Sequence, residues 1–370
     1  MAASAPMLVH VESLQTAVPM RMAGAGKSLP IAVSGPPLTA AELQRRFRAV
    51  LYYRGAGAEV EAAARERAAW VKESLCAALV DHPEMAGRLR RHGDGNDDDD
   101  GRLWEVKLRD TGVRLVQASV EATMAEFLEA RGVDRERKEA ALAQWTDVDV
   151  HEPDICAPLF IQLTRFLDGG YAIGVSCSLL LADPLSLIGF LKSWARKNTE
   201  MQAQSKHVAH PVIQYTHYIQ SPGTAKRVKS GTSTLGIATA TAADDSTTTV
   251  LFGAPDTTSD HRALAAACVG MASKRLGGAK EPPRFTVMAR DSSKGLHVQT
   301  CGDREACLGH GHGLAARVAQ WSEAGLEDLA LEGSKPVHVS YSISPSADEG
   351  LVVVMPAGGA ELLISVTVPN

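Results

Sequence analysis

The residue types that could act on a substrate gather at one place in the chain. Ser176, Cys177 and Ser178 carry hydroxyl or thiol groups, and Asp183 follows after four apolar residues. A serine or cysteine nucleophile needs an adjacent base to take its proton, and no His, Asp or Glu stands among these three residues. The pattern therefore favours a tightly packed strand of small residues over a catalytic triad.

A second group of reactive types consists of Cys301, Cys307, His310 and His312. Their spacing matches no zinc pattern, and the surrounding glycines are typical of a flexible connector, so no metal site is predicted. His338 alternates with apolar neighbours, which favours a strand histidine facing solvent or a groove over a titrating functional group.

The segments that must position residues 176–183 have clear patterns. Two apolar runs, residues 160–166 and 171–177, are joined through Asp168-Gly169, which is a strong hairpin signal. Both faces of residues 171–177 are apolar or small, and this predicts a strand inside a sheet. Asp183, followed by a proline, suits the N-cap of a helix over residues 185–195.

Further patterns divide the chain in two. Strands are predicted at residues 47–53, 285–288, 337–342, 351–355 and 362–368, and helices at residues 61–80, 263–276, 314–321 and 326–331. Residues 198–248 are rich in Ser, Thr, Ala and Gln, which indicates a crossing linker. The sequence thus predicts an α/β or α+β chain with domains at residues 1–197 and 249–370.

Composition excludes several classes of function. The 370 residues carry a formal charge of -5 and only 5% aromatic residues, which argues against a nucleic-acid partner. The most apolar stretch stops at Asp183, short of the roughly 18 residues that a membrane span needs. The first residues lack the features of a secretory signal, and the six cysteines form no C-x-x-C pair. We therefore expect a cytoplasmic monomer with no tightly bound cofactor.

Three segments make the chain similar to the BAHD-type acyl-CoA-dependent acyltransferases of plants. HPEMAGRL at residues 82–89 resembles the P-L-A-G-R-L element of that family, with one residue more after the proline. Residues 169–183 and 335–356 resemble later family segments in the same order. The resemblance implies a two-lobed, chloramphenicol-acetyltransferase-like fold with mixed sheets, a central cleft, a shortened second lobe and acyl-CoA as a possible substrate.

The family signature H-x-x-x-D is degenerate in this chain. Its aspartate falls on Asp183, but Leu179 stands in place of the catalytic histidine. Leucine has no lone pair, and loss of a general base removes about 10²–10⁴-fold in rate. The resemblance implies that Leu179 points into the cleft, with Ser176 and Ser178 beside it. It also implies that Asp183 is structural and meets Arg290, whose guanidinium can match a carboxylate through two donors.

The second family signature, D-F-G-W-G, is replaced by Ala330-Leu331-Glu332-Gly333-Ser334. The eceriferum/glossy-type wax branch also lacks this second signature, and residues 47–56, 111–121 and 157–166 resemble segments of that branch. That resemblance implies a catalytically impaired accessory of a fatty-acid elongase condensing enzyme, acting in very-long-chain synthesis for cuticular wax, peripherally at the cytosolic face of the endoplasmic reticulum. Two alternatives stay open: an active acyl-CoA-dependent O- or N-acyltransferase with an unorthodox base, and a lyase or other changed chemistry in the same cleft.

Overall fold

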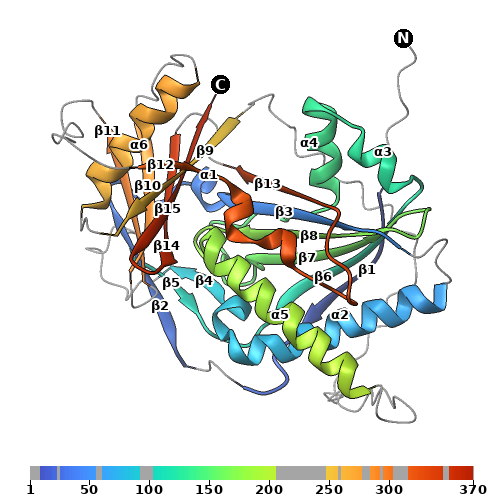
Figure 1. Cartoon of the computed structure of the whole chain (residues 1–370). Helices are drawn as coiled ribbons and strands as arrows, with labels where there is room; N and C mark the ends of the chain where they lie inside the picture. Colours follow the sequence, from blue (N-terminus) through green and yellow to red (C-terminus); the bar gives the residue numbers. More distant parts are fainter. Residues whose placement is uncertain are drawn as a thin grey trace.

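The structure is a computed structural model built around two mixed β-sheets, of six and nine strands (Figure 1). It describes residues 9–22, 26–55, 61–91, 103–205, 247–256, 260–276, 284–291, 295–302, 316–344 and 350–369. Helices lie against both sheets, so the predicted mixed α/β fold class is confirmed.

The six-stranded sheet contains the strand that carries the candidate site. Its order is β1 (Val9–Ala17), β6 (Val113–Val120), β7 (Leu159–Arg165), β8 (Tyr171–Ser178), β3 (Arg46–Tyr53) and β13 (His338–Ser344). β8 pairs antiparallel with β7 and β3, and all eight of its residues are buried. The predicted interior position of this strand is confirmed.

The turn between β7 and β8 is the predicted hairpin. Arg165 and Tyr171 are the last partners of the antiparallel ladder. Gly169 has a φ of 77°, a conformation that glycine adopts without steric cost. The Asp168 Oδ1 atom accepts a hydrogen bond from the Gly170 N–H at 3.2 Å, which closes the turn locally.

The nine-stranded sheet takes strands from both ends of the chain. Its order is β12 (Arg317–Ala319), β9 (Thr247–Pro255), β15 (Glu361–Pro369), β14 (Gly350–Gly358), β10 (Arg284–Arg290), β11 (Leu296–Gly302), β2 (Ser28–Ser34), β5 (Leu103–Lys107) and β4 (Arg88–Arg91). β2, β4 and β5 come from before residue 197, whereas β13 of the six-stranded sheet comes from after residue 249. Each sheet therefore contains strands from both of the predicted domains, residues 1–197 and 249–370. The domain boundaries themselves stay a prediction.

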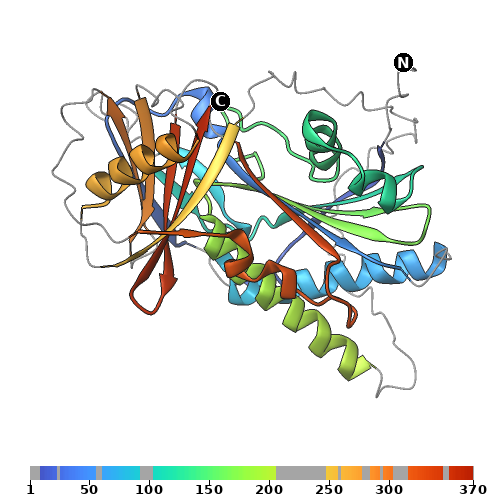
Figure 2. The same ribbon diagram turned by 45° about the horizontal axis from the view of Figure 1, so that its top comes forward.

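The helices cover the faces of the sheets (Figure 2). They are α1 (Ala40–Leu43), α2 (Glu61–Asp81), α3 (Met124–Leu128), α4 (Gly132–Ala141), α5 (Pro184–Ser205) and α6 (His261–Arg275), with 3-10 turns at Pro83–Ala86, Trp321–Ala324 and Leu326–Asp328. α2 and α5 lie on one face of the six-stranded sheet, α3 and α4 lie on the other, and α6 lies on the nine-stranded sheet. Among the helices of the described ranges, none has the length and apolar character that crossing a bilayer requires.

Three local predictions differ from the structure. The helix predicted at residues 326–331 is only a 3-10 turn over Leu326–Asp328, followed by extended backbone at Leu329. The helix predicted at residues 314–321 is wrong, because β12 forms there and pairs with β9 at the sheet edge. A short strand of this kind depends on a partner that is distant in sequence, which local periodicity cannot reveal. α5 continues to Ser205, so the first residues of the predicted 198–248 linker are helical. Residues 206–246 of that linker lie outside the described residues.

The HPEMAGRL segment contains a buried arginine, Arg88, whose guanidinium donates hydrogen bonds to backbone carbonyls. Arg88 Nη1 donates to the carbonyls of Gly87 and Gly112, both at 2.9 Å, and Nη2 donates to the Thr111 carbonyl at 3.5 Å. Burial lowers the pKa of Arg88 to about 10. The arginine thus ties the start of β4 to the loop before β6.

We expect Arg88→Met to lower the free energy of unfolding by about 2 kcal/mol, because buried carbonyl oxygens lose their donor. Urea denaturation followed by circular dichroism measures this loss. Arg90→Met is the matched control, since Arg90 is exposed on the same strand and its ion pair with Glu105 spans 3.9 Å. Equal unfolding midpoints for the two variants would contradict the assigned role of Arg88.

Candidate functional site

Leu179 occupies the position where the family resemblance places a base. It follows β8 directly, and its N–H donates to the Arg45 carbonyl at 3.0 Å, so the pairing with β3 continues past the strand end. Its side chain is 1% exposed and belongs to the main hydrophobic core. An apolar, buried side chain therefore fills the position that the chemistry would require to be titratable.

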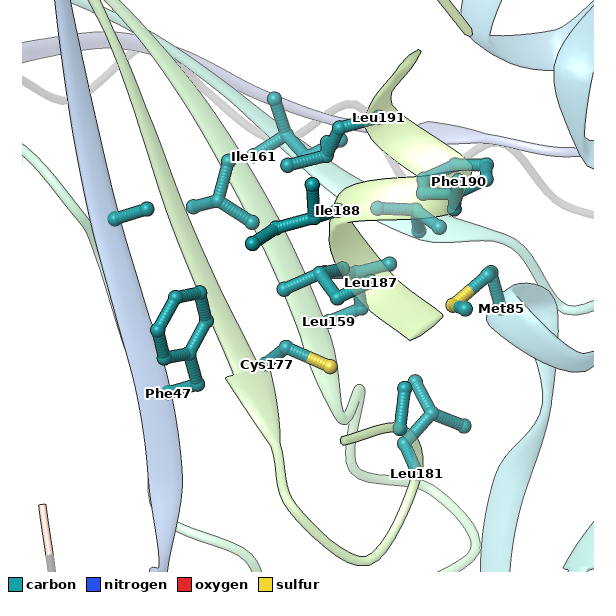
Figure 3. Packing of buried hydrophobic residues seen from close by; sticks show 14 of the residues in the cluster. Phe47, Met85, Leu159, Ile161, Cys177, Leu181, Leu187, Ile188, Phe190 and Leu191 are labelled. Atoms are coloured by element: carbon teal, nitrogen blue, oxygen red, sulfur yellow. The ribbon is translucent and has the colours of Figure 1, made fainter. Parts of the chain in front are cut away.

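Cys177 lies on the same face of β8 and is also part of the core. Figure 3 shows its side chain among those of Phe47, Leu159 and Leu187. Burial raises the pKa of Cys177 to about 12, although the nearby Arg290 guanidinium acts in the opposite direction. The group is thus a neutral thiol at physiological pH, and a neutral thiol is a poor nucleophile.

Ser176 and Ser178 lie on the other face of β8, because successive side chains of a strand point to opposite sides. Ser176 Oγ donates to the Ala143 carbonyl at 2.9 Å. Ser178 Oγ accepts from the Leu180 N–H at 3.3 Å. Both serines are fully buried. The structure therefore pairs both hydroxyls with backbone groups and does not bring Ser176 to the face that carries Leu179.

Asp183 starts α5 as its N-cap, which confirms the predicted cap. Its Oδ1 atom accepts from the Ser186 N–H at 2.9 Å, and its Oδ2 atom accepts from the Ser186 hydroxyl at 2.5 Å. The side-chain oxygen at this position satisfies an N–H group that has no partner within the helix. Pro184 fits the first helical position, where no backbone N–H is needed.

The same carboxylate meets Arg290 of β10. Arg290 Nε lies 3.5 Å from Asp183 Oδ2, and the two side chains are 8% and 3% exposed. Arg290 Nη2 also donates to the Leu180 carbonyl at 3.1 Å, so the guanidinium contacts the backbone before α5 as well as the carboxylate. Burial lowers the pKa of Arg290, and Asp183 opposes that change. The contact joins the nine-stranded sheet to the start of α5.

A second buried arginine, Arg45, also contacts β10, and no sequence pattern indicated this contact. Arg45 is 2% exposed and lies across the β3–β8 pairing from Leu179. Its Nη2 atom lies 3.2 Å from Glu42 and donates to Thr286 Oγ1 at 3.0 Å. Since alternate residues of a strand share a face, Thr286 and Arg290 project from β10 toward the same side.

The residues that the family resemblance aligns with D-F-G-W-G form a tight turn. Leu331 and Ser334 make a β-bridge, and the two residues between them, Glu332 and Gly333, have φ values of 51° and 77°. Glu332 pairs with Arg67 of α2 at 2.9 Å. The Arg67 guanidinium also lies 4.3 Å from the centre of the Tyr171 ring, at the start of β8. This turn is thus connected to both α2 and the central strand.

Other candidate positions lie away from this site. A cavity of about 240 Å³ opens beside the first turn of α6, and its lining includes Val287 and Ala289. These residues alternate with Thr286 and Arg290 along β10, so the cavity lies on the opposite face of the sheet. Within the described ranges, no three His, Cys, Asp or Glu side chains are grouped to hold a metal ion. Cys301 is buried in β11, while Cys307, His310 and His312 lie outside those ranges.

The polar side chains named above around position 179 are engaged in structural contacts. Arg45 and Arg290 are buried cations with acidic partners, and Cys177 is a neutral thiol. Asp183 is engaged by Ser186 and Arg290, and this arrangement suits a structural role. The named groups therefore connect the two sheets and the start of α5, and position 179 itself carries an apolar side chain.

Comparison with known proteins places the chain among transferases. The model of the Transferase family matches residues 50–248, which is more than half of the chain. Over 156 residues the chain is 30% identical to a hydroxycinnamoyl-CoA:piscidic acid hydroxycinnamoyltransferase of Actaea racemosa, covering 42% of this chain and 32% of the relative. Over 131 residues it is 34% identical to the protein ECERIFERUM 26-like of Arabidopsis thaliana, covering 34% of this chain and 27% of the relative.

The matched parts thus span about a third of the length of these curated relatives. Among solved structures, that of vinorine synthase is similar with a TM-score of 0.49 and 16% identity. This similarity covers 98% of this chain and 95% of that one.

Proposed function

Because this chain belongs to the Transferase family, that of the BAHD-type acyltransferases, we propose that it is a catalytically impaired member that assists fatty-acid elongation. The observation that carries the proposal is Leu179, a buried apolar residue in place of the base. A base must take the proton of the acceptor hydroxyl or amine as it attacks the thioester, and this step has no proton acceptor at position 179.

The neighbours of Leu179 support the same proposal. Ser176 and Ser178 are committed to backbone partners, and burial keeps the Cys177 thiol protonated. The Leu331–Ser334 turn replaces the second family signature and is tied to α2 by the Arg67–Glu332 ion pair. The protein then acts through binding, and its partner is a condensing enzyme of the very-long-chain elongase at the cytosolic face of the endoplasmic reticulum.

One observation favours a second candidate function. Relatives of the chain include proteins named as acyltransferases, among them one that uses hydroxycinnamoyl-CoA. An active enzyme in this fold would hold the acceptor and the acyl-CoA thioester together and gain rate from proximity. It would then depend on a base other than residue 179.

Two measurements separate the candidates. Co-expression with a condensing enzyme, in a host with a simple lipid profile, is expected to extend the product chain length beyond that of the condensing enzyme alone. Unchanged chain lengths would overturn the accessory function. Purified protein given hydroxycinnamoyl-CoA or very-long-chain acyl-CoA, with alcohol and amine acceptors, is expected to release no free CoA above the uncatalysed rate. Sustained release would favour the transferase instead.

Leu179→His tests whether the missing base alone explains the proposed inactivity. We expect this variant to lose about 2 kcal/mol of stability, because an imidazole replaces an apolar side chain inside the core. We also expect it to stay inactive, since the Leu331–Ser334 turn differs from the family signature. Thermal denaturation and the CoA-release assay measure the two effects. A rate increase of about 10²-fold or more would show that only the base was lost.

A further inference from the structure

His338 makes a contact that requires its neutral form. It begins β13, the strand at one edge of the six-stranded sheet, and pairs with Tyr52 of β3. Arg135 Nη2 of α4 lies within hydrogen-bonding distance of His338 Nε2. Because a guanidinium can only donate, His338 Nε2 must accept, and the ring proton then resides on Nδ1.

The groups around His338 come from α4 and β3. Arg135 Nε also lies 2.9 Å from Glu139 Oε1. The Tyr52 ring centre lies 5.8 Å from that of His338. Arg48, which pairs with Ser342 four positions further along the same ladder, is buried and interacts with Glu139. A proton on His338 would place a second cation against Arg135, and Glu139, which pairs with Arg135, would offset part of this charge.

We propose that the Arg135–His338 pair is a proton-sensitive contact that fastens the start of β13 to α4 at neutral pH and releases it in acid. Protonation converts the acceptor at Nε2 into a donor, so the hydrogen bond from Arg135 is lost and two cations face each other. Among the strands of the described ranges, β13 pairs with β3 alone, so the contact with α4 is a second attachment for the first residues of this edge strand.

The direction of the pH effect follows from the same surroundings. Burial of the ring is the main cause that lowers the pKa of His338. The Arg135 cation lowers this pKa further, and the Glu139 carboxylate raises it. A histidine whose pKa is depressed by folding stabilises the folded state above its unfolded pKa of about 6.5. That stabilisation decreases as the pH falls below this value toward the pKa of the folded protein.

Hydrogen exchange of the full chain tests the contact at pH 7.5 and 5.5, after correction for the intrinsic pH dependence. We expect β13 amides of the native protein to exchange about tenfold faster at the lower pH, because a hydrogen bond to a charged group is lost. His338→Gln presents a neutral amide at both pH values, so its β13 exchange should change little with pH. His297→Gln is the matched control, because His297 pairs with Asp291 in the other sheet and its loss should leave the β13 response intact.

Two results would overturn the proposal. One is β13 protection in the native protein that is the same at both pH values. The other is a pH response that persists unchanged in His338→Gln. If that variant does not fold, titration of the native His338 ring by NMR decides instead, and a pKa at or above about 6.5 would exclude the contact as drawn.

Discussion

Asp183→Ala is expected to lower the free energy of unfolding by about 3–5 kcal/mol, because it removes the buried carboxylate that the buried Arg290 guanidinium faces. The two side chains are 3% and 8% exposed, so solvent cannot replace the lost partner. The substitution also removes the N-cap of α5, which contributes about 1 kcal/mol by itself. Guanidinium chloride denaturation measures the total.

Two further variants separate the ion pair from the cap. Asp183→Asn keeps a side chain that caps helices well but removes the charge. We therefore expect it to show most of the decrease in the free energy of unfolding that Asp183→Ala shows. Ser186→Ala removes only the hydroxyl bonded to Asp183 Oδ2 and should cost about 1 kcal/mol. If Asp183→Asn were as stable as the native protein, Asp183 would serve only as a helix cap.

A double-mutant cycle with Arg290→Met tests the coupling directly. Each single variant leaves one buried charge, whereas the double variant leaves none, so the double loss should be smaller than the sum of the single losses. Additive losses would mean that the contact across 3.5 Å contributes nothing to joining β10 and α5.

Gly174→Ala is expected to destabilise the protein by about 3 kcal/mol or more, because no space exists for a side chain. A Cβ at this position of β8 would lie 1.8 Å from the Leu142 carbonyl oxygen and 2.9 Å from the Ala143 Cα atom. Because both are backbone atoms, the steric clash can be relieved only if the backbone of residues 142–143 moves. That movement would break the Ser176–Ala143 hydrogen bond.

Gly189→Ala provides the matched control for Gly174→Ala. Gly189 is exposed on α5, and a Cβ there would meet nothing within 4 Å. Alanine should therefore stabilise the helix by about 0.5–1 kcal/mol. Thermal melting of the two variants should shift in opposite directions, and equal melting temperatures would contradict the close approach at Gly174.

Several features of the site could be predicted from the sequence because they depend on neighbours along the chain. The Asp168-Gly169 turn, the apolar strand after it and the Asp183 cap each involve residues within a few positions of one another. Turn and cap geometry is satisfied by local hydrogen bonds, so residue type at a fixed offset is sufficient information. The chemical character of position 179 is equally local, since leucine cannot accept a proton in any fold.

Other features depended on contacts that no local pattern contains. The Arg45–Thr286 hydrogen bond joins residues 241 positions apart, and its donor lies in a run of charged residues that suggests an exposed segment. His338 is paired with Arg135 across 203 positions, on a strand that joins the six-stranded sheet from the far end of the chain.

The sequence by itself determined the hairpin, the helix start and the apolar character of position 179. The tertiary structure decided which face each β8 side chain occupies, which strands share a sheet and which buried charges meet. The physical reason is that turns and caps are stabilised within one stretch of backbone. Sheet partners and buried ion pairs are stabilised only when distant segments come together and exclude water.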